Sequence, residues 1–162
     1  MSAQIPAILT WRDLHLADAF VCDELNNRLA TEAGCSLIEH DLLAWLAATP
    51  GKRLRMLDLA TRLRVTQGGL TRIIDRLVER GWIERDRPEK NRREVYATLT
   101  RTGTGAYRTA RSVYSHVIEE TFVRHLTEEE LQALSDITHK LATGRSRSTP
   151  VGRPSRKTDA NS

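Results

Sequence analysis

A group of polar and basic residues recurs at helical spacing between Thr66 and Arg80. The letters TQGGLTR open this stretch, and Arg72, Arg76 and Arg80 follow on one face of a predicted helix. Arginine can bind guanine or a phosphate, glutamine suits adenine, and threonine suits a hydroxyl or thymine-methyl contact. These residue types at this spacing indicate binding to a polyanion.

Nine residues are therefore candidate DNA contacts: Thr66, Gln67, Gly68, Gly69, Thr71, Arg72, Arg76, Arg92 and Arg93. Gln67 and Thr71 are the first polar side chains able to reach base edges, and Arg72 is expected nearer the bases than Arg76. The alternative for each arginine is an exposed helix charge that pairs locally, for instance Arg76 with Glu79 or a contact with Arg80. For these single residues the sequence leaves both readings open.

Gly68 and Gly69 stand where this helix begins, although each glycine costs about 1 kcal/mol relative to alanine inside a helix. They would let the helix end approach a phosphate backbone, where free N–H groups and the helix dipole favour an anion. They would equally let two helices pack closely in the preceding turn. The two explanations are compatible.

The charge distribution is uneven along the chain. Residues 52–93 hold 13 Lys or Arg against 6 Asp or Glu, a net charge of +7, and residues 144–162 carry +4. The rest of residues 1–143 carries −7. A basic segment on an otherwise acidic body favours a polyanionic partner, with a solvated charged face as the alternative.

Periodicity and turn signals predict a mainly α fold with a small β-hairpin wing, an α+β class. Helices are expected at about 11–32, 37–48, 55–64, 67–80, 102–124 and 127–141, and strands at 82–88 and 93–100. Ser36 with Glu39 forms a capping box, and Thr66 and Gly81 bound the fourth helix. Helix, tight turn, helix and hairpin is the order of a winged helix-turn-helix. At the hairpin tip, Arg92 and Arg93 can follow the backbone or enter the minor groove, or they lie in a solvated turn.

Length and composition exclude several classes of protein. A chain of 162 residues suggests one domain, and the Arg-, Ser- and Pro-rich residues 144–162 are predicted to be a disordered basic tail. The tail adds nonspecific DNA affinity or only solubility. No signal peptide or long apolar run occurs, so a cytoplasmic protein without a membrane partner is expected. No catalytic grouping, phosphate-binding loop or cofactor motif emerges, so no enzyme and no cofactor are expected.

The letters DRLVERGWIER at 75–85 and NRREVYATLTRTG at 91–103, with LTR at 70–72, resemble the MarR (multiple antibiotic resistance regulator) family, especially actinobacterial members. The resemblance spans about residues 10–143. It implies a MarR-type domain at 1–143, with a winged helix-turn-helix at about 36–101 and dimerisation helices at about 8–34 and 102–143.

The resemblance also implies a homodimer that binds a pseudopalindromic double-stranded DNA operator and acts as a repressor of transcription. The family's wing arginine falls on Arg93. Asn91 replaces the usual aspartate, which removes a charge that would orient this arginine. Gly68 stands where relatives often carry serine, so one hydroxyl contact is lost.

Members of this family bind small phenolic or amphipathic effectors, which here implies release from DNA by such a ligand. The candidate effector pocket comprises Trp11, His15, Asp41, Trp45 and Arg85. The alternatives are that both tryptophans belong to the core and that Asp41 only favours the start of its helix.

Other ways of sensing, and another function, remain open from the sequence. Oxidation of Cys22 is one, although nothing nearby in sequence lowers the pKa of its thiol. The five histidines contain no close ligand pair, so no metal site is predicted. A winged helix used for protein–protein contact is the competing function, and a shallow dependence on salt would distinguish it from DNA binding.

Overall fold

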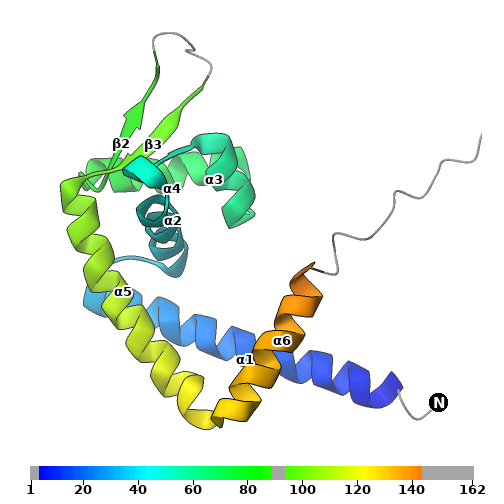
Figure 1. Cartoon of the computed structure of the whole chain (residues 1–162). Coiled ribbons are helices and arrows are strands. Elements are labelled where there is room, and N and C mark those ends of the chain that lie inside the picture. Colours follow the sequence, from blue (N-terminus) through cyan, green and yellow to red (C-terminus); the bar gives the residue numbers. More distant parts are fainter. Residues whose placement is uncertain (1–3, 89–93, 144–162) are drawn as a thin grey trace, which may run out of the picture. The chain divides into compact units, whose positions relative to one another are not determined.

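A computed structural model describes residues 4–88 and 94–143 (Figure 1). Its elements in chain order are α1 (Gln4–Arg28), the π-helical turn η1 (Leu29–Ala33), α2 (Leu37–Ala48), the 3-10 turn η2 (Pro50–Lys52), β1 (Arg53–Arg55), α3 (Met56–Leu63), α4 (Gln67–Glu79), β2 (Ile83–Asp86), β3 (Tyr96–Leu99), α5 (Arg101–Thr121), the 3-10 turn η3 (Val123–His125) and α6 (Glu128–Thr143). The predicted mainly helical class with a small β wing is confirmed. The chain through His125 forms one compact unit, and α6 belongs to a second one, described by itself.

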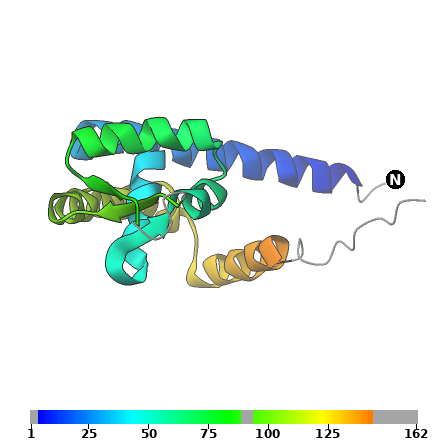
Figure 2. The same cartoon turned by 90° about the horizontal axis from the view of Figure 1, so that it is seen from above.

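The sheet has three antiparallel strands in the order β1-β3-β2, so the expected two-stranded hairpin gains a strand. Leu54 of β1 pairs with Ala97 of β3, and Arg85 of β2 pairs with Ala97 from the other side. β1 packs on α3, β2 on α4 and β3 on α2 (Figure 2). A strand of three residues is too short to show alternation, which explains why the sequence did not reveal β1.

Local caps set the starts of the helices as the sequence predicts. Ser36 and Glu39 form the complete capping box of α2. Thr66 Oγ1 accepts a hydrogen bond from the N–H of Gly69, and Gly81 leaves α4 with a φ of 67°. These hydrogen bonds form within three or four residues, so the sequence contains all of their information.

Two clusters of buried side chains hold the first unit together. The larger joins α2, α3, α4 and the sheet through residues such as Leu42, Leu46, Leu59, Ile74 and Ile83. The smaller joins the end of α1 to α5 through Leu25, Leu29, Cys35, Ala110 and Val117. The two clusters share Trp82, a partly buried residue between α4 and β2 that packs against both.

The first half of α1 differs from expectation in extent and in burial. The helix begins at Gln4 rather than near Trp11. Trp11 is 68% exposed and Leu14 is 40% exposed, although their spacing had suggested an inward face. A helical stripe shows that a helix is amphipathic but does not say which surface covers it.

In the second unit, α6 also has a predicted apolar stripe that is partly exposed. Thr127 and Glu130 exchange backbone and side-chain hydrogen bonds at its start, as the letters LTEEEL predict. Leu131 and Leu134 are partly buried, whereas Ile137 and Leu141 are exposed. Among the described residues, every helix is too short or too polar to cross a membrane.

Gly103→Ala is expected to destabilise the fold. An added Cβ would lie 2.0 Å from the carbonyl oxygen of Trp82 and 2.8 Å from Leu99 Cδ1. Overpacking of this kind costs about 1–3 kcal/mol. Gly105→Ala is the matched control, because its added Cβ meets nothing within 4 Å and the better helix former raises the free energy of unfolding by up to about 1 kcal/mol. Urea unfolding measures both, and equal midpoints for the two variants would contradict the steric explanation.

Candidate nucleic-acid interface

The N-terminal turn of α4 presents a polar, solvent-exposed surface. Gln67, Thr71 and Arg72 are exposed, while Leu70 between them is buried beneath the helix. The Thr71 hydroxyl donates to the carbonyl oxygen of Gln67 at 2.9 Å, so it remains an acceptor for an outside donor. This turn therefore combines exposed hydrogen-bonding groups with a fixed hydrophobic anchor.

The structure separates the two explanations for the paired glycines. A Cβ built on Gly68 meets nothing within 4 Å, so packing inside this chain does not require glycine there. A Cβ on Gly69 would lie 3.2 Å from Oγ1 of Thr66, the cap of its own helix. A side chain would thus be close to the helix cap at Gly69, whereas one at Gly68 would meet none of the described residues.

The arginines of α4 and its C-cap differ in whether they pair with a carboxylate of this chain. Arg76 donates from Nε to Oε1 of Glu39 at 3.1 Å, and Arg80 Nη1 lies 3.9 Å from the other oxygen of the same buried carboxylate. The partner of Arg76 is therefore on α2 rather than at Glu79. Arg72 is exposed and makes no ion pair within the described part of the chain. Arg72 is the arginine of α4 that is free to meet an outside anion.

A network at the base of the wing was missed by sequence reasoning. The guanidinium of Arg53 lies 3.8 Å from the ring centroid of Tyr96 and also pairs with Asp86. The Tyr96 hydroxyl accepts a hydrogen bond from Arg55 and donates one to Glu94, both at 2.9 Å. These contacts tie β1 to the strands of the wing. The predicted contacts Arg92 and Arg93, with Asn91, lie outside the described residues.

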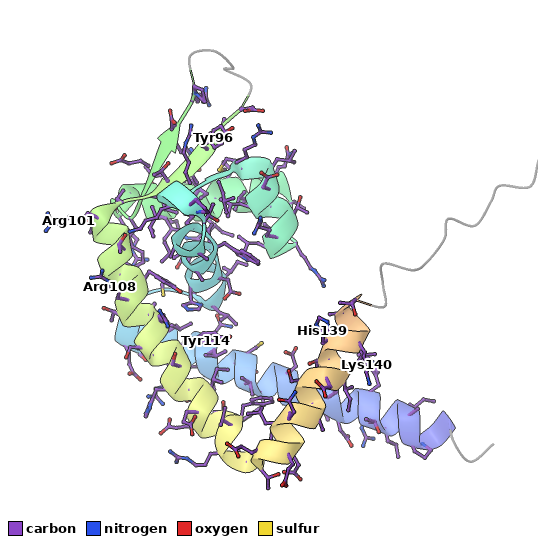
Figure 3. All side chains as sticks on the ribbon, viewed as in Figure 1. Tyr96, Arg101, Arg108, Tyr114, His139 and Lys140 are labelled. Carbon is purple, nitrogen blue, oxygen red and sulfur yellow. The ribbon has the colours of Figure 1, made fainter. Side chains whose placement is uncertain are left out.

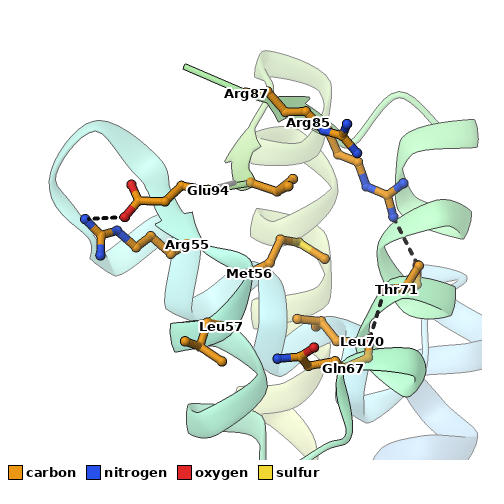
Figure 4. A pocket seen from close by; sticks show the side chains of 10 residues that line it. Arg55, Met56, Leu57, Gln67, Leu70, Thr71, Arg85, Arg87 and Glu94 are labelled. Carbon is orange, nitrogen blue, oxygen red and sulfur yellow. Dashed lines mark hydrogen bonds and ion pairs between the residues drawn. The ribbon is translucent and has the colours of Figure 1, made fainter. Parts of the chain in front are cut away.

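A cleft of about 430 Å³ lies between α3, the start of α4 and the wing. Its lining residues are Arg55, Met56, Leu57, Gln67, Leu70, Thr71, Arg85, Arg87, Glu94 and Val95 (Figure 4). Arg85 reaches from β2 to α4, with Nη2 at 2.7 Å from Oδ1 of Asp75 and 3.2 Å from the carbonyl oxygen of Thr71. The cleft thus combines apolar side chains with guanidinium groups and borders the polar turn of α4.

The five residues predicted to form an effector pocket lie on α1, α2 and β2. Trp11 and His15 are exposed on α1, which packs on α5 and α2. Trp45 is on α2, with the guanidinium of Arg62 4.6 Å from its ring centroid. Arg85 belongs to the cleft beside α4. Arg85 lies on β2, which packs on α4 and β3, so the five-residue pocket stays a prediction.

Asp41 takes part in a different arrangement, around the buried His40. The imidazole of His40 stacks on Tyr114 of α5 with ring centroids 4.4 Å apart, and its Nδ1 lies 3.1 Å from Oδ1 of Asp41. Burial raises the pKa of the Tyr114 hydroxyl, and the nearby charge of Asp41 acts in the same direction. These contacts join α2 to α5, which is a structural role that the sequence did not indicate.

Neither cysteine is in an environment that activates a thiol. Burial raises the pKa of the Cys35 thiol to about 11. The pKa of Cys22 is raised by burial and then by the neighbouring carboxylate of Asp18. Because the thiolate is the reactive form, these surroundings oppose redox sensing through Cys22.

A short helix, a tight turn, a capped second helix and a β ribbon define a winged helix-turn-helix protein. The model of the MarR family matches residues 36–95, which include both helices, the turn between them and β2. Over these residues the chain is thus similar to the MarR family of regulators.

Two curated relatives and a solved structure are similar to this chain. The HTH-type transcriptional regulator BilQ of Clostridium symbiosum is 32% identical over 97 residues, covering 60% of this chain and 65% of the relative. The multiple antibiotic resistance protein MarR of Escherichia coli is 30% identical over 84 residues, covering 52% and 58%. The match thus spans less than two thirds of either relative. The MarR-family regulator Sco3205 of Streptomyces coelicolor, solved in complex with DNA, is 29% identical with a TM-score of 0.79, covering 86% of this chain and 88% of that one.

Both thiols are expected to react slowly with a disulfide reagent such as DTNB at pH 8. A raised pKa leaves a smaller thiolate fraction at a given pH, so each rate should be below that of free cysteine. The rate at Cys35 should increase about tenfold per pH unit until the pH nears its pKa of about 11. The protein unfolded in urea is the control, in which both thiols should react freely. A native Cys22 as fast as free cysteine would contradict this assignment.

Proposed function

We propose that this protein is a transcriptional regulator that reads double-stranded DNA with the N-terminal turn of α4. Gly68 is the observation that carries the proposal: its missing side chain serves no contact within the chain, yet it lies among the exposed Gln67, Thr71 and Arg72. A helix start without a side chain at this point allows a phosphate or a base edge to come close. Thr66, Gly69, Arg92 and Arg93 complete the proposed contact set, whereas Arg76 serves mainly to hold α4 on α2.

We further propose that the protein acts as a homodimer on a pseudopalindromic operator. Four large apolar side chains of α1 are 58–68% exposed: Ile8, Trp11, Leu16 and Phe20. Exposed apolar surface of this extent marks an interaction site. A two-fold dimer would present two α4 helices to half-sites about one DNA turn apart, so the operator would share its symmetry.

The same proposal includes repression and its release by a small amphipathic effector. The cleft of about 430 Å³ supports this step, because Met56, Leu57 and Leu70 offer apolar contacts beside the guanidinium of Arg85. A phenolic or aromatic carboxylate has matching apolar and anionic parts. Its binding would compete with Asp75 and Thr71 for Arg85 and occupy the border of the polar turn, which opposes DNA binding.

The test of DNA binding is a fluorescence titration of the protein against the fragment upstream of its own gene, at two salt concentrations with nonspecific competitor. Tight, competitor-resistant binding that weakens steeply with salt is expected, because phosphate contacts release counterions. Binding no stronger than to competitor, with little salt dependence, would favour a winged helix used for protein contacts.

Gly68→Ala is expected to weaken operator binding at least about tenfold, from the added methyl group at a close contact, while leaving the fold as stable or slightly more stable. Gly105→Ala makes the same chemical change on α5, where a Cβ also meets nothing within 4 Å, and should keep operator affinity. The titration above and urea unfolding measure the two properties. Unchanged affinity in Gly68→Ala would remove this turn from the interface.

Arg85→Gln is expected to reduce the ability of an aromatic carboxylate, for example benzoate, to release the protein from operator DNA. The lost guanidinium is the group that would pair with the carboxylate, so about tenfold more ligand should be required. Trp45→Phe is the control, since Trp45 lies outside the cleft. The concentration of ligand for half release measures the effect, and a stronger effect of Trp45→Phe than of Arg85→Gln would contradict binding of the ligand in this cleft.

A further inference from the structure

A second cleft, of about 570 Å³, lies at the start of α5 and shares no lining residue with the cleft beside α4. It is lined by Lys52, Leu99, Thr100, Arg101, Thr104, Gly105 and Arg108. Arg101 and Arg108 are seven residues apart on one side of α5 (Figure 3), and Lys52 comes from the turn before β1. Two separate segments thus bring three cations to one concavity.

Lys52 is held in place at this cleft. Its Nζ donates a hydrogen bond to Oγ1 of Thr104 at 3.1 Å, across 52 residues of sequence. The Thr104 hydroxyl donates in turn to the carbonyl oxygen of Thr100 at 2.8 Å. Since an ammonium group has three protons, Lys52 keeps donors for a further partner.

The three cations lack the carboxylate partner that several other arginines of the first unit have. Arg28, Arg53, Arg55, Arg76, Arg80 and Arg85 each lie within ion-pair distance of a carboxylate. Within residues 4–88 and 94–143, no carboxylate pairs with Lys52, Arg101 or Arg108. Gathered like charges repel one another, and a bound anion would remove that cost.

We propose that the cleft formed by Lys52, Arg101, Thr104 and Arg108 is a binding site for a phosphate group, either free or on a small organic molecule. Three cationic donors match the charge and the oxygen atoms of a phosphate dianion. The volume of about 570 Å³ exceeds what inorganic phosphate fills and falls in the range of small-molecule sites. Leu99 offers an apolar contact for the organic part of such a molecule, and Gly105 has no side chain to occupy the space beside it.

The site depends on its side chains rather than on the end of α5. The N–H of Gly103 in the first turn is already bonded to Oγ1 of Thr100 at 2.9 Å.

The site is also separate from the proposed DNA-binding turn of α4. Thr100 contacts the carbonyl oxygen of Gly81, just past the C-terminal end of α4, and the 13 residues of α4 put the two ends of that helix about 20 Å apart. The inference therefore goes beyond the proposed function and does not rest on it.

The experiment is a titration of the ¹⁵N-labelled, DNA-free protein with inorganic phosphate and, separately, phenyl phosphate, with chloride adjusted to constant ionic strength. Saturable shifts of the amide signals of Lys52, Thr104 and Gly105 are expected. Lys52→Gln and Arg101→Gln should each weaken binding about tenfold or more. Arg111→Gln is the matched control, because Arg111 is an exposed arginine of α5 outside the cleft. The spectra themselves show that each variant remains folded.

Each outcome is decisive for the site. Tighter binding of phenyl phosphate would support it and identify a phosphorylated organic ligand, whereas equal affinities would support it with the free anion as the ligand. Linear shifts without saturation, or equal binding by Lys52→Gln and Arg111→Gln, would overturn it. Shifts of these amides by a duplex of unrelated sequence, but not by phosphate, would also overturn it and assign the cations to DNA. Because no operator is used, failure here leaves the proposed function untouched.

Discussion

The buried carboxylate of Glu39 is the group on which the presentation of α4 depends. One side chain completes the capping box of α2 through the N–H of Ser36 and receives Arg76 and lies near Arg80 of α4. A buried carboxylate is costly unless it is paired and hydrogen-bonded, so α2 and α4 are held in one mutual position. The exposed turn at the other end of α4 is thereby presented from a fixed base, with Leu70 and Ile74 packed beneath it.

The basic residues likewise have two roles: some hold elements of the fold together, and others are available to bind anions. Arginines whose guanidinium groups pair with carboxylates or stack on aromatic rings hold elements together, as Arg53 does at Tyr96 and Arg80 does at Trp82. Cations without such partners, including Arg72 and the three around the second cleft, are available to anions from outside. The excess of positive charge in residues 52–93 is therefore partly structural, and a count of charges overstates the part that can bind DNA.

Apolar side chains of α1 also differ in role, because some are buried in the core and others are exposed. The end of α1 and the start of η1 pack on α5 through Leu25 and Leu29, whereas Trp11 and Phe20, earlier on α1, are exposed to solvent. Such side chains become buried only when another surface packs against them. These exposed apolar side chains are the observation that supports the proposed dimer.

The sequence by itself determined the features that depend on neighbours in the chain. Ser36 with Glu39, Thr66 with Gly69, and Gly81 set the ends of α2 and α4 through hydrogen bonds and dihedral angles within a few residues. The winged order of elements and the family resemblance follow from the same local signals. The roles of Arg92 and Arg93 in binding DNA remain predictions, because both lie outside the described residues.

The tertiary structure alone decided which distant residues meet. It brought Arg76 to Glu39 across 37 residues, Arg53 to Asp86 across 33 and Lys52 to Thr104 across 52. It also created β1 by pairing with β3, placed Arg85 beside α4 and left Trp11 exposed. Periodicity and capping report only which face of an element is apolar and where it ends, whereas the partner of that face depends on how all the elements pack.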